Sequence, residues 1–386
     1  MSHWGALVRK AFSMSSLTVH RDWLFSGMVA AVCVVLGFLE LSPETGAAVG
    51  RHSRGRVVAA DNSHVRVNLI VKTEHQVLKV ELEDGPHEGQ SISVDNALTG
   101  KMEMDEFYAV GDEVLVEYDV AGGTLRNGTV RGHYRLRLEL GLIAAFAVLL
   151  LIVAGRTGAK AVVSFVFAAM VLWKLFFPLL LRGAPPIPTG LGIVAVLTAV
   201  ITFMVGGLNR RGAATFIGAT AGVLLTCGLA VLFAHAFRLH GAVRPFAEAL
   251  LYSGYVDLGL SDIFIASIFI ASSGAVMDLA MDIAASMDEI YQKQPRIGML
   301  EHIRSGLAVG QAVIGTMTTT LLLAYSSSHI TMFMLFMAKG LSLYNILNAP
   351  FVAAEILNIL VGSFGLVTVA PLTAVVSGLL YRMGRP

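Results

Sequence analysis

Long apolar runs alternate with short polar connections through most of the chain, and one polar region, 40–137, interrupts them. A run of about 20 apolar residues is long enough to cross a bilayer as a helix. By length and composition, eight runs predict membrane spans. They are 23–39, 138–154, 161–181, 190–208, 213–237, 258–285, 305–325 and 364–381.

The region before the last span is predicted to be interrupted. We expect 330–345, whose apolar part is too short to cross, to enter the membrane partway and return as a re-entrant or interfacial segment. Gly362, Gly365 and Pro371 interrupt the next apolar run, so 349–360 is expected to form a half-helix. Interrupted hydrophobic segments at mid-membrane depth are a pointer to transport sites.

The polar region 40–137 carries the alternating pattern of β-strands, separated by Gly-Pro, Asn-Gly and Gly-Gly turns. Five or six short strands predict a small β-barrel of the OB-like kind. Such barrels often bind nucleic acid, but a basic groove with interleaved aromatic residues is missing, so no nucleic-acid partner is expected. The expected strands are 56–59, 65–71, 77–82, 91–94, 114–118 and 128–134.

The basic N-terminus, 1–22, precedes the first apolar run. That run could be a cleaved signal peptide, but no clean cleavage site follows it directly, so an uncleaved anchor over 23–39 is favoured. The positive flank predicts a cytoplasmic N-terminus. The first span then delivers the β-rich domain, 40–137, to the extracytoplasmic side, and 138–386 forms the multi-pass transmembrane domain.

Basic residues in the later connections test this orientation, because cytoplasmic loops carry an excess of Lys and Arg. The C-terminus, with Arg382 and Arg385, also falls in the cytoplasm. Arg238 and Arg244 conflict with the rule, since they lie in a connection expected outside. The connections expected in the cytoplasm are 155–160, 209–211 and 286–304.

Composition agrees with a membrane protein. Of the 386 residues, 55% are hydrophobic and 14% are charged, and the mean hydropathy is +0.70. A soluble domain has about 25% charged residues, so the lipid bilayer is the expected surroundings. The two cysteines, Cys33 and Cys227, lie inside apolar runs. They exclude a disulfide framework and a cysteine-rich metal site.

Three stretches resemble the signatures of the YibE/F-like family of bacterial multi-pass membrane proteins. The resemblance covers roughly 49–381 and implies a bacterial plasma-membrane location and the layout described above. It implies no established chemistry. The stretches are Gly274-Ala-Val-Met-Asp-Leu-Ala-Met-Asp-Ile-Ala-Ala-Ser-Met-Asp-Glu289, Gly315-Thr-Met-Thr-Thr-Thr-Leu-Leu-Leu-Ala-Tyr325, and Ala354-Glu-Ile-Leu with Gly362-Ser-Phe-Gly365 and Pro371-Leu-Thr373.

Asp278 and Asp282 are the strongest candidates for chemistry. They are four residues apart, so a helix places them on one face. Two neighbouring carboxylates in a low dielectric do not both ionise cheaply, which suits proton carriage or cation coordination. One alternative is that the span from Ile263 ends near Asp282, in the headgroups. Another is a structural pairing with Arg304 or Lys339.

Polar side chains gather in two further clusters. Hydroxyl groups in an apolar helix can coordinate an ion, or they can bond to carbonyls of their own helix. A carboxylate with amides beside an interrupted helix resembles an ion or solute site, but an interfacial helix with one wet face is the alternative. The first cluster is Gln311, Thr316, Thr318, Thr319 and Thr320, and the second is Asn345, Asn348, Glu355 and Asn358.

Two further groups of residues give weaker signals. The pairs His87–Glu88 and Asp105–Glu106 could bind a cation, although solvated loops are favoured. His235 and His329 are expected to be bonded core or interface residues rather than ligands. The chain has no Walker A, H-E-x-x-H or redox cysteine motif, so neither an enzyme nor a cofactor is expected.

The hypothesis favoured by these patterns is a membrane transporter for a small solute or ion. Asp278, Asp282 and Glu355 would line a polar path and couple it to a proton or cation. Neutral ligands would come from Gln311, Thr318, Thr319, Thr320, Asn348 and Asn358. The alternative is a non-transporting scaffold or accessory protein that acts through its extracytoplasmic β-domain on a protein partner. An oligomer fits either hypothesis.

Overall fold

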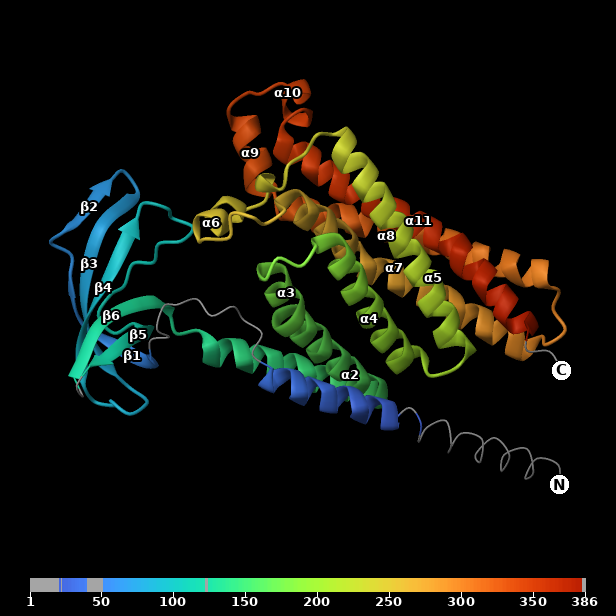
Figure 1. The fold of residues 1–386 in the computed structure, drawn as a ribbon, viewed down its shortest axis with the longest axis horizontal. Coiled ribbons are helices and arrows are strands. Elements are labelled where there is room, and N and C mark those ends of the chain that lie inside the picture. The colour runs from blue at the N-terminus through green and yellow to red at the C-terminus, as the bar shows by residue number, and fades with distance from the viewer. Residues whose placement is uncertain (1–20, 22, 40–50, 122–123, 384–386) are drawn as a thin grey trace. The chain divides into compact units, whose positions relative to one another are not determined.

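The computed structural model describes residues 21, 23–39, 51–121 and 124–383. The chain divides into two compact units, Glu44–Leu149 and Met1–Pro43 with Leu150–Pro386. The first contains a β-barrel and the second is helical (Figure 1). Apart from Arg21, the basic N-terminus predicted over 1–22 lies outside the described residues.

Five strands close the barrel. β1 pairs antiparallel with β3 and β5, β3 with β4, and β5 with β6, while β4 and β6 pair in parallel. The short strand β2 pairs only with β3. The predicted small β-barrel is therefore confirmed. The strands are β1 (Arg51–Asp61), β2 (Val65–Asn68), β3 (Val71–Leu82), β4 (Ser91–Thr99), β5 (Glu113–Ala121) and β6 (Thr124–His133).

One strand prediction is wrong. The sequence favoured a single strand over 65–71, but the chain turns at Leu69 and Ile70, between β2 and β3. Leu69 has a φ of 58°, in the left-handed region that few residues other than glycine adopt. Because Leu69 is apolar, it fits the pattern of a strand, and the sequence gives no sign of a turn there.

The parallel contact between β4 and β6 closes the ring. It consists of two residue pairs, Val94 with Gly128 and Asp95 with Thr129. A Cβ atom at Gly128 would overlap the side chain of Val94. Glycine is therefore required where the two strands meet. Val94 itself points into the barrel core, as the strict alternation of buried and exposed residues along β4 requires.

Six of the described helical stretches are long and apolar enough to cross a membrane, as expected of a membrane protein. Trp23–Phe38 is a shorter apolar helix. The other helices are α2 (Leu136–Val171), η1 (Leu172–Phe176), α3 (Phe177–Leu181), α4 (Pro186–Gly206), α5 (Arg210–Ala236), η2 (Gly241–Val243), α6 (Ala247–Tyr252), α7 (Leu260–Lys293), α8 (Met299–Ser327), α9 (Ile330–Ala338), α10 (Leu343–Leu347) and α11 (Pro350–Met383).

The connection predicted over 155–160 is almost absent. Helical structure continues from α2 to α3, and the break is confined to Gly155, with φ 53° and ψ −123°. A Cβ atom at Gly158 would overlap the backbone of Leu150, so the residues on either side of the break pack closely. A single glycine therefore replaces the expected loop.

The predicted half-helix over 349–360 is also wrong, because α11 is continuous and includes Pro371. A Cβ atom at Gly362 would lie 3.2 Å from the Cβ of Ser272, and one at Gly365 would overlap Thr226. These glycines permit close packing instead of breaking the helix. Before α11, α9 and α10 have no buried residues, and their depth in a membrane stays a prediction.

Helix α7 lies at the centre of the helical unit and contacts α4, α5, α8 and α11. Small residues bring α5 and α11 together. A Cβ atom at Gly218 would overlap Thr373, and one at Gly222 would lie 3.0 Å from the Cβ of Val369. The Gly-x-x-x-Gly pattern on α5 therefore marks a close helix contact.

Candidate functional site

Glu355 is a carboxylate buried among the helices, with 3% of its surface exposed. The Arg244 Nη1 donates a hydrogen bond of 3.3 Å to its Oε2, and the His329 Nε2 lies 3.7 Å from the same oxygen. Glu355 lies early in α11, Arg244 follows η2, and His329 precedes α9. Three segments that are distant in sequence thus meet at the end of the bundle where α11 begins (Figure 1).

The Arg244 guanidinium has a second partner, the ring of Phe264, whose centroid is 5.1 Å away. Arg244 is partly exposed, while the Glu355 side chain is 4% exposed. A carboxylate removed from water is costly unless a cation and hydrogen bonds compensate it. Arg244 therefore compensates the charge of Glu355 and anchors the connection between α5 and α7 to α11.

A cavity of about 450 Å³ lies beside this ion pair. Arg244, Ser267 and Asn358 contribute its polar side chains, and the Ser267 hydroxyl donates to the Phe264 carbonyl. The remaining wall is largely apolar, with Phe246, Leu250 and Phe264 among the lining residues. Asn358 is 5% exposed, and its Oδ1 has no hydrogen-bond partner among the described residues. A buried carbonyl oxygen without a donor is costly, and it indicates a missing ligand or water.

This arrangement can bind a small molecule with an apolar body. A donor group on the molecule would reach the Asn358 Oδ1, and an acceptor or anionic group would reach Arg244. Pockets of this size with few polar groups are typical ligand sites. Arg244 belongs to both the cavity and the Glu355 ion pair, so a ligand in the cavity would contact the partner of Glu355.

Of the nine residues proposed for the solute or ion path, two lie at this ion pair and cavity, Glu355 and Asn358. The sequence interpretation missed Arg244 and His329 as their neighbours. In the sequence, Arg244 stands out only because a basic residue is not expected in a connection on the extracytoplasmic side. This unexpected arginine is the signal in the sequence that could have pointed to a buried acidic partner.

Asp278 and Asp282 lie elsewhere. Both are exposed, on the face of α7 opposite its buried residues. Neither forms a hydrogen bond or ion pair with any residue that the structure describes, which includes Arg304 and Lys339. Their common face, predicted from the spacing, is therefore turned away from the bundle core. Their role in a proton or cation path stays a prediction.

The hydroxyl cluster bonds to its own helix. Thr316, Thr318, Thr319 and Thr320 each donate to a carbonyl three or four residues earlier in α8. This is the structural alternative raised by the sequence. Gln311, like Asn345 and Asn348 in and after α10, is exposed. The structure joins none of these residues to Glu355 by a hydrogen bond.

Of the two pairs considered for a cation, Asp105–Glu106 is held by protein groups. Asp105 accepts from the Thr99 Oγ1 at 2.9 Å and the Gly100 N–H at 2.6 Å. Glu106 accepts from the Arg135 Nη2 at 2.8 Å and the His133 N–H at 2.9 Å. In the described ranges, no three His, Cys, Asp or Glu side chains are grouped to hold a metal ion.

The environment of Glu106 changes its pKa. Burial favours the neutral carboxyl group, but hydrogen bonds from Arg135 and the His133 backbone outweigh burial and lower the pKa. Burial raises the pKa of the Tyr108 hydroxyl, and the neighbouring Glu106 carboxylate raises it further. Through these hydrogen bonds, Glu106 connects the loop before β5 to the end of β6 and to Arg135.

Comparisons with curated proteins and with solved structures return no match. Family profiles do match. The profile described as YibE/F-like protein covers residues 142–383, which is more than half of the chain, and the profile described as YibE/F family N-terminal domain covers 54–133. The helical region and the barrel thus match two profiles of one family, and the chain belongs to the YibE/F-like family.

Proposed function

We propose that the protein is a membrane transporter that binds a small solute in the cavity beside Asn358 and couples its movement to a proton or cation through Glu355. The observation that carries the proposal is a buried carboxylate, paired with Arg244 and His329, beside a cavity with an unpartnered amide oxygen. Ionisable groups within membrane spans usually line substrate paths or proton relays.

Coupling would arise from competition for Arg244. An acceptor group on the solute draws the guanidinium N–H donors toward the cavity and weakens the bond to Glu355. The carboxylate, left with less compensation, takes up a proton from water, and His329 lies close enough to pass it. Loss of the proton restores the ion pair and favours release of the solute, so the two binding events are reciprocally linked.

The proposed location is the bacterial plasma membrane, with eight spans, cytoplasmic termini and the barrel on the extracytoplasmic side. Arg210, Arg211 and the basic residues of 286–304 support this orientation. The ion pair with Glu355 reduces the conflict at Arg244, because that cation is compensated within the protein. The ring order β1-β3-β4-β6-β5 supports an OB-like barrel.

Thermal stability of the full-length purified protein against a panel of solutes, cations and pH values tests the proposal. A ligand that binds the folded state raises the melting temperature. We expect the shift to be lost in Glu355→Gln and Asn358→Ala, and counterflow in proteoliposomes to be lost with it. The matched control is Glu289→Gln, which removes an exposed carboxylate paired with Lys293. A ligand shift that survives in Glu355→Gln and Asn358→Ala places the solute elsewhere and refutes the proposal.

A second candidate is a scaffold that docks a protein partner through the barrel. The turn between β2 and β3 exposes large apolar side chains, with Leu69 98% and Ile70 74% exposed, and Met102 is 63% exposed. Ile70 and Met102 line the same small hollow. Photo-crosslinking from position 69 in cells should then capture a protein, and Ile70→Ser should prevent it. Crosslinks to lipid alone would contradict a scaffold role.

A further inference from the structure

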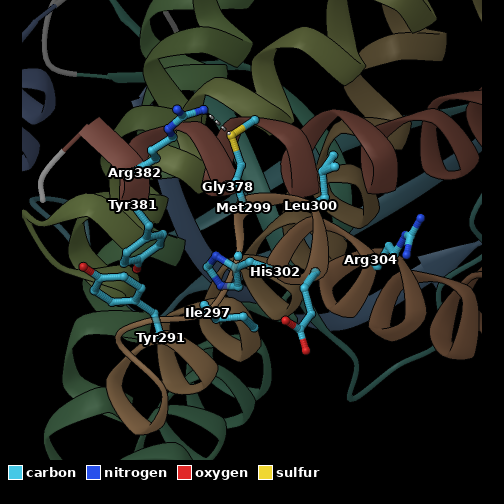
Figure 2. Close-up of a pocket in the computed structure, with 11 residues that line it drawn as sticks. Tyr291, Ile297, Met299, Leu300, His302, Arg304, Gly378, Tyr381 and Arg382 are labelled. Atoms are coloured by element: carbon cyan, nitrogen blue, oxygen red, sulfur yellow. Dashed lines mark hydrogen bonds between the residues drawn. The ribbon is translucent and has the colours of Figure 1, made fainter.

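A second cavity, of about 570 Å³, lies at the other end of α7. The connection from α7 to α8 forms one side, and the last turns of α11 form the other (Figure 2). Tyr291 is near the end of α7, whereas the cavity beside Asn358 is lined by Leu260 at its start. The two cavities are thus separate sites.

The first turn of α8 faces this cavity with free backbone donors. Gly298 is the N-cap and provides no capping side chain, and the first backbone bond of the helix runs from the His302 N–H to the Gly298 carbonyl. The N–H groups of Met299, Leu300 and Glu301 therefore have no acceptor within the helix. The positive end of a 29-residue helix adds to their attraction for an anion.

Two arginines line the same cavity, Arg304 from α8 and Arg382 from α11. Figure 2 shows them on either side of His302. Arg382 donates only a weak bond, from Nη1 to the Met299 sulfur at 3.6 Å, and Arg304 forms no ion pair with a described residue. Both guanidinium groups keep donors for a ligand. Glu301 is a lining carboxylate, and it would repel an anion, so an anionic ligand would have to lie nearer the arginines.

His302 provides an independent indication of a ligand. It lines the cavity and is 2% exposed. Its Nε2 lies 2.8 Å from the Met287 carbonyl oxygen, which can only accept, so Nε2 carries the hydrogen. The Nδ1 is then an acceptor in the neutral ring, and it has no hydrogen-bond partner in the part of the chain that the structure describes. An acceptor nitrogen on a buried ring that lines the cavity offers a place for a donor group of a ligand.

We propose that this cavity binds a phosphate monoester group, carried by an anionic lipid headgroup or by a free phosphate compound. The phosphate oxygens would accept from the N–H groups of the α8 N-terminus and from Arg304 and Arg382. The hydroxyl of a singly protonated phosphate would donate to the His302 Nδ1. Leu300, 71% exposed beside the cavity, offers an apolar contact to an acyl chain. Basic pockets between membrane helices are known to suit lipid headgroups.

Native mass spectrometry of the full chain tests the site. The protein is released from nanodiscs of phosphatidylcholine that contain phosphatidic acid, and the retained lipids are counted. Arg382→Gln and Arg304→Gln each remove one lining cation. Arg296→Gln is the matched control, because it removes an exposed arginine of the same connection that does not line the cavity. The melting temperature of each variant checks its folding.

We expect retention of phosphatidic acid to weaken about tenfold in Arg382→Gln and in Arg304→Gln, and to stay unchanged in Arg296→Gln. Competition by glycerol phosphate or inorganic phosphate would assign the site to the phosphate group alone. Retention without such competition would assign it to the lipid. Equal loss in all three variants, or no preference for phosphatidic acid over phosphatidylcholine and no binding of free phosphate, would overturn the proposal.

Discussion

Arg244 and Glu355 are 111 residues apart in the chain, yet the Arg244 Nη1 donates a hydrogen bond of 3.3 Å to the Glu355 Oε2. The bond joins the connection between α5 and α7 to the start of α11. It also places a compensated charge pair at the edge of the cavity that holds Asn358. One arginine thereby fixes a loop, neutralises a buried acid and lines the candidate binding site.

Removing only one member of this pair should be costly. We expect Arg244→Met to lower the free energy of unfolding by about 3 kcal/mol, because it leaves a buried carboxylate without its cation. The double variant Arg244→Met/Glu355→Gln should recover most of that loss. Thermal unfolding in detergent measures both. Additive losses in the double variant would show that the two side chains act independently.

Helix packing at Gly218 should tolerate no added methyl group. Because a Cβ atom there overlaps Thr373, Gly218→Ala should destabilise the contact between α5 and α11 by about 1–3 kcal/mol. Gly228→Ala is the control, since it lies on the same helix with nothing within 4 Å of the added atom. That variant should be neutral or slightly stabilising. Equal melting temperatures for the two variants would contradict the close contact.

Glu106 should make the barrel sensitive to acid. Its folded pKa is lowered, so its contribution to stability is complete above the ordinary glutamate value of about 4.3 and is lost as the pH falls through the folded value. We expect Glu106→Gln to reduce protease resistance of the barrel at neutral pH and to have less effect in acid. Glu81→Gln, at an exposed position of β3, should change neither. A pH-independent loss in Glu106→Gln would indicate a purely steric role.

Asp278 and Asp282 should contribute little to folding of the single chain. Both are exposed and unpaired among the described residues, so Asp278→Asn and Asp282→Asn should each change the free energy of unfolding by less than about 0.5 kcal/mol. A role in an ion path predicts instead that proteoliposome activity falls while the melting temperature is kept. If either variant lowers the melting temperature markedly, the aspartate has a stabilising partner, and the prediction is wrong.

The sequence predicts much of the secondary structure because each element depends on local patterns. The apolar run 213–237 corresponds to α5, and the alternation near Ser91–Val94 corresponds to β4. The breaks within the helices are harder to predict from the sequence. Gly362 and Gly365 resemble helix breakers in the sequence, and only their contacts with Ser272 and Thr226 show that they serve close packing.

The candidate site was only partly predictable for a similar reason. Spacing along α7 correctly placed Asp278 and Asp282 on one face, but it does not say whether that face meets the core or the surroundings. Glu355 and Asn358 were identified from their chemistry. Their neighbours Arg244 and His329 come from other segments, and nothing local in the sequence specifies that meeting.

The closure of the barrel at Gly128 has a consequence for its dynamics. Two residue pairs hold β4 to β6, whereas antiparallel ladders hold the rest of the ring. Regions with few contacts open locally before the whole structure unfolds. In amide hydrogen exchange, this seam should therefore lose its protection first, and each opening would turn the closed ring into a curved sheet with two free edges.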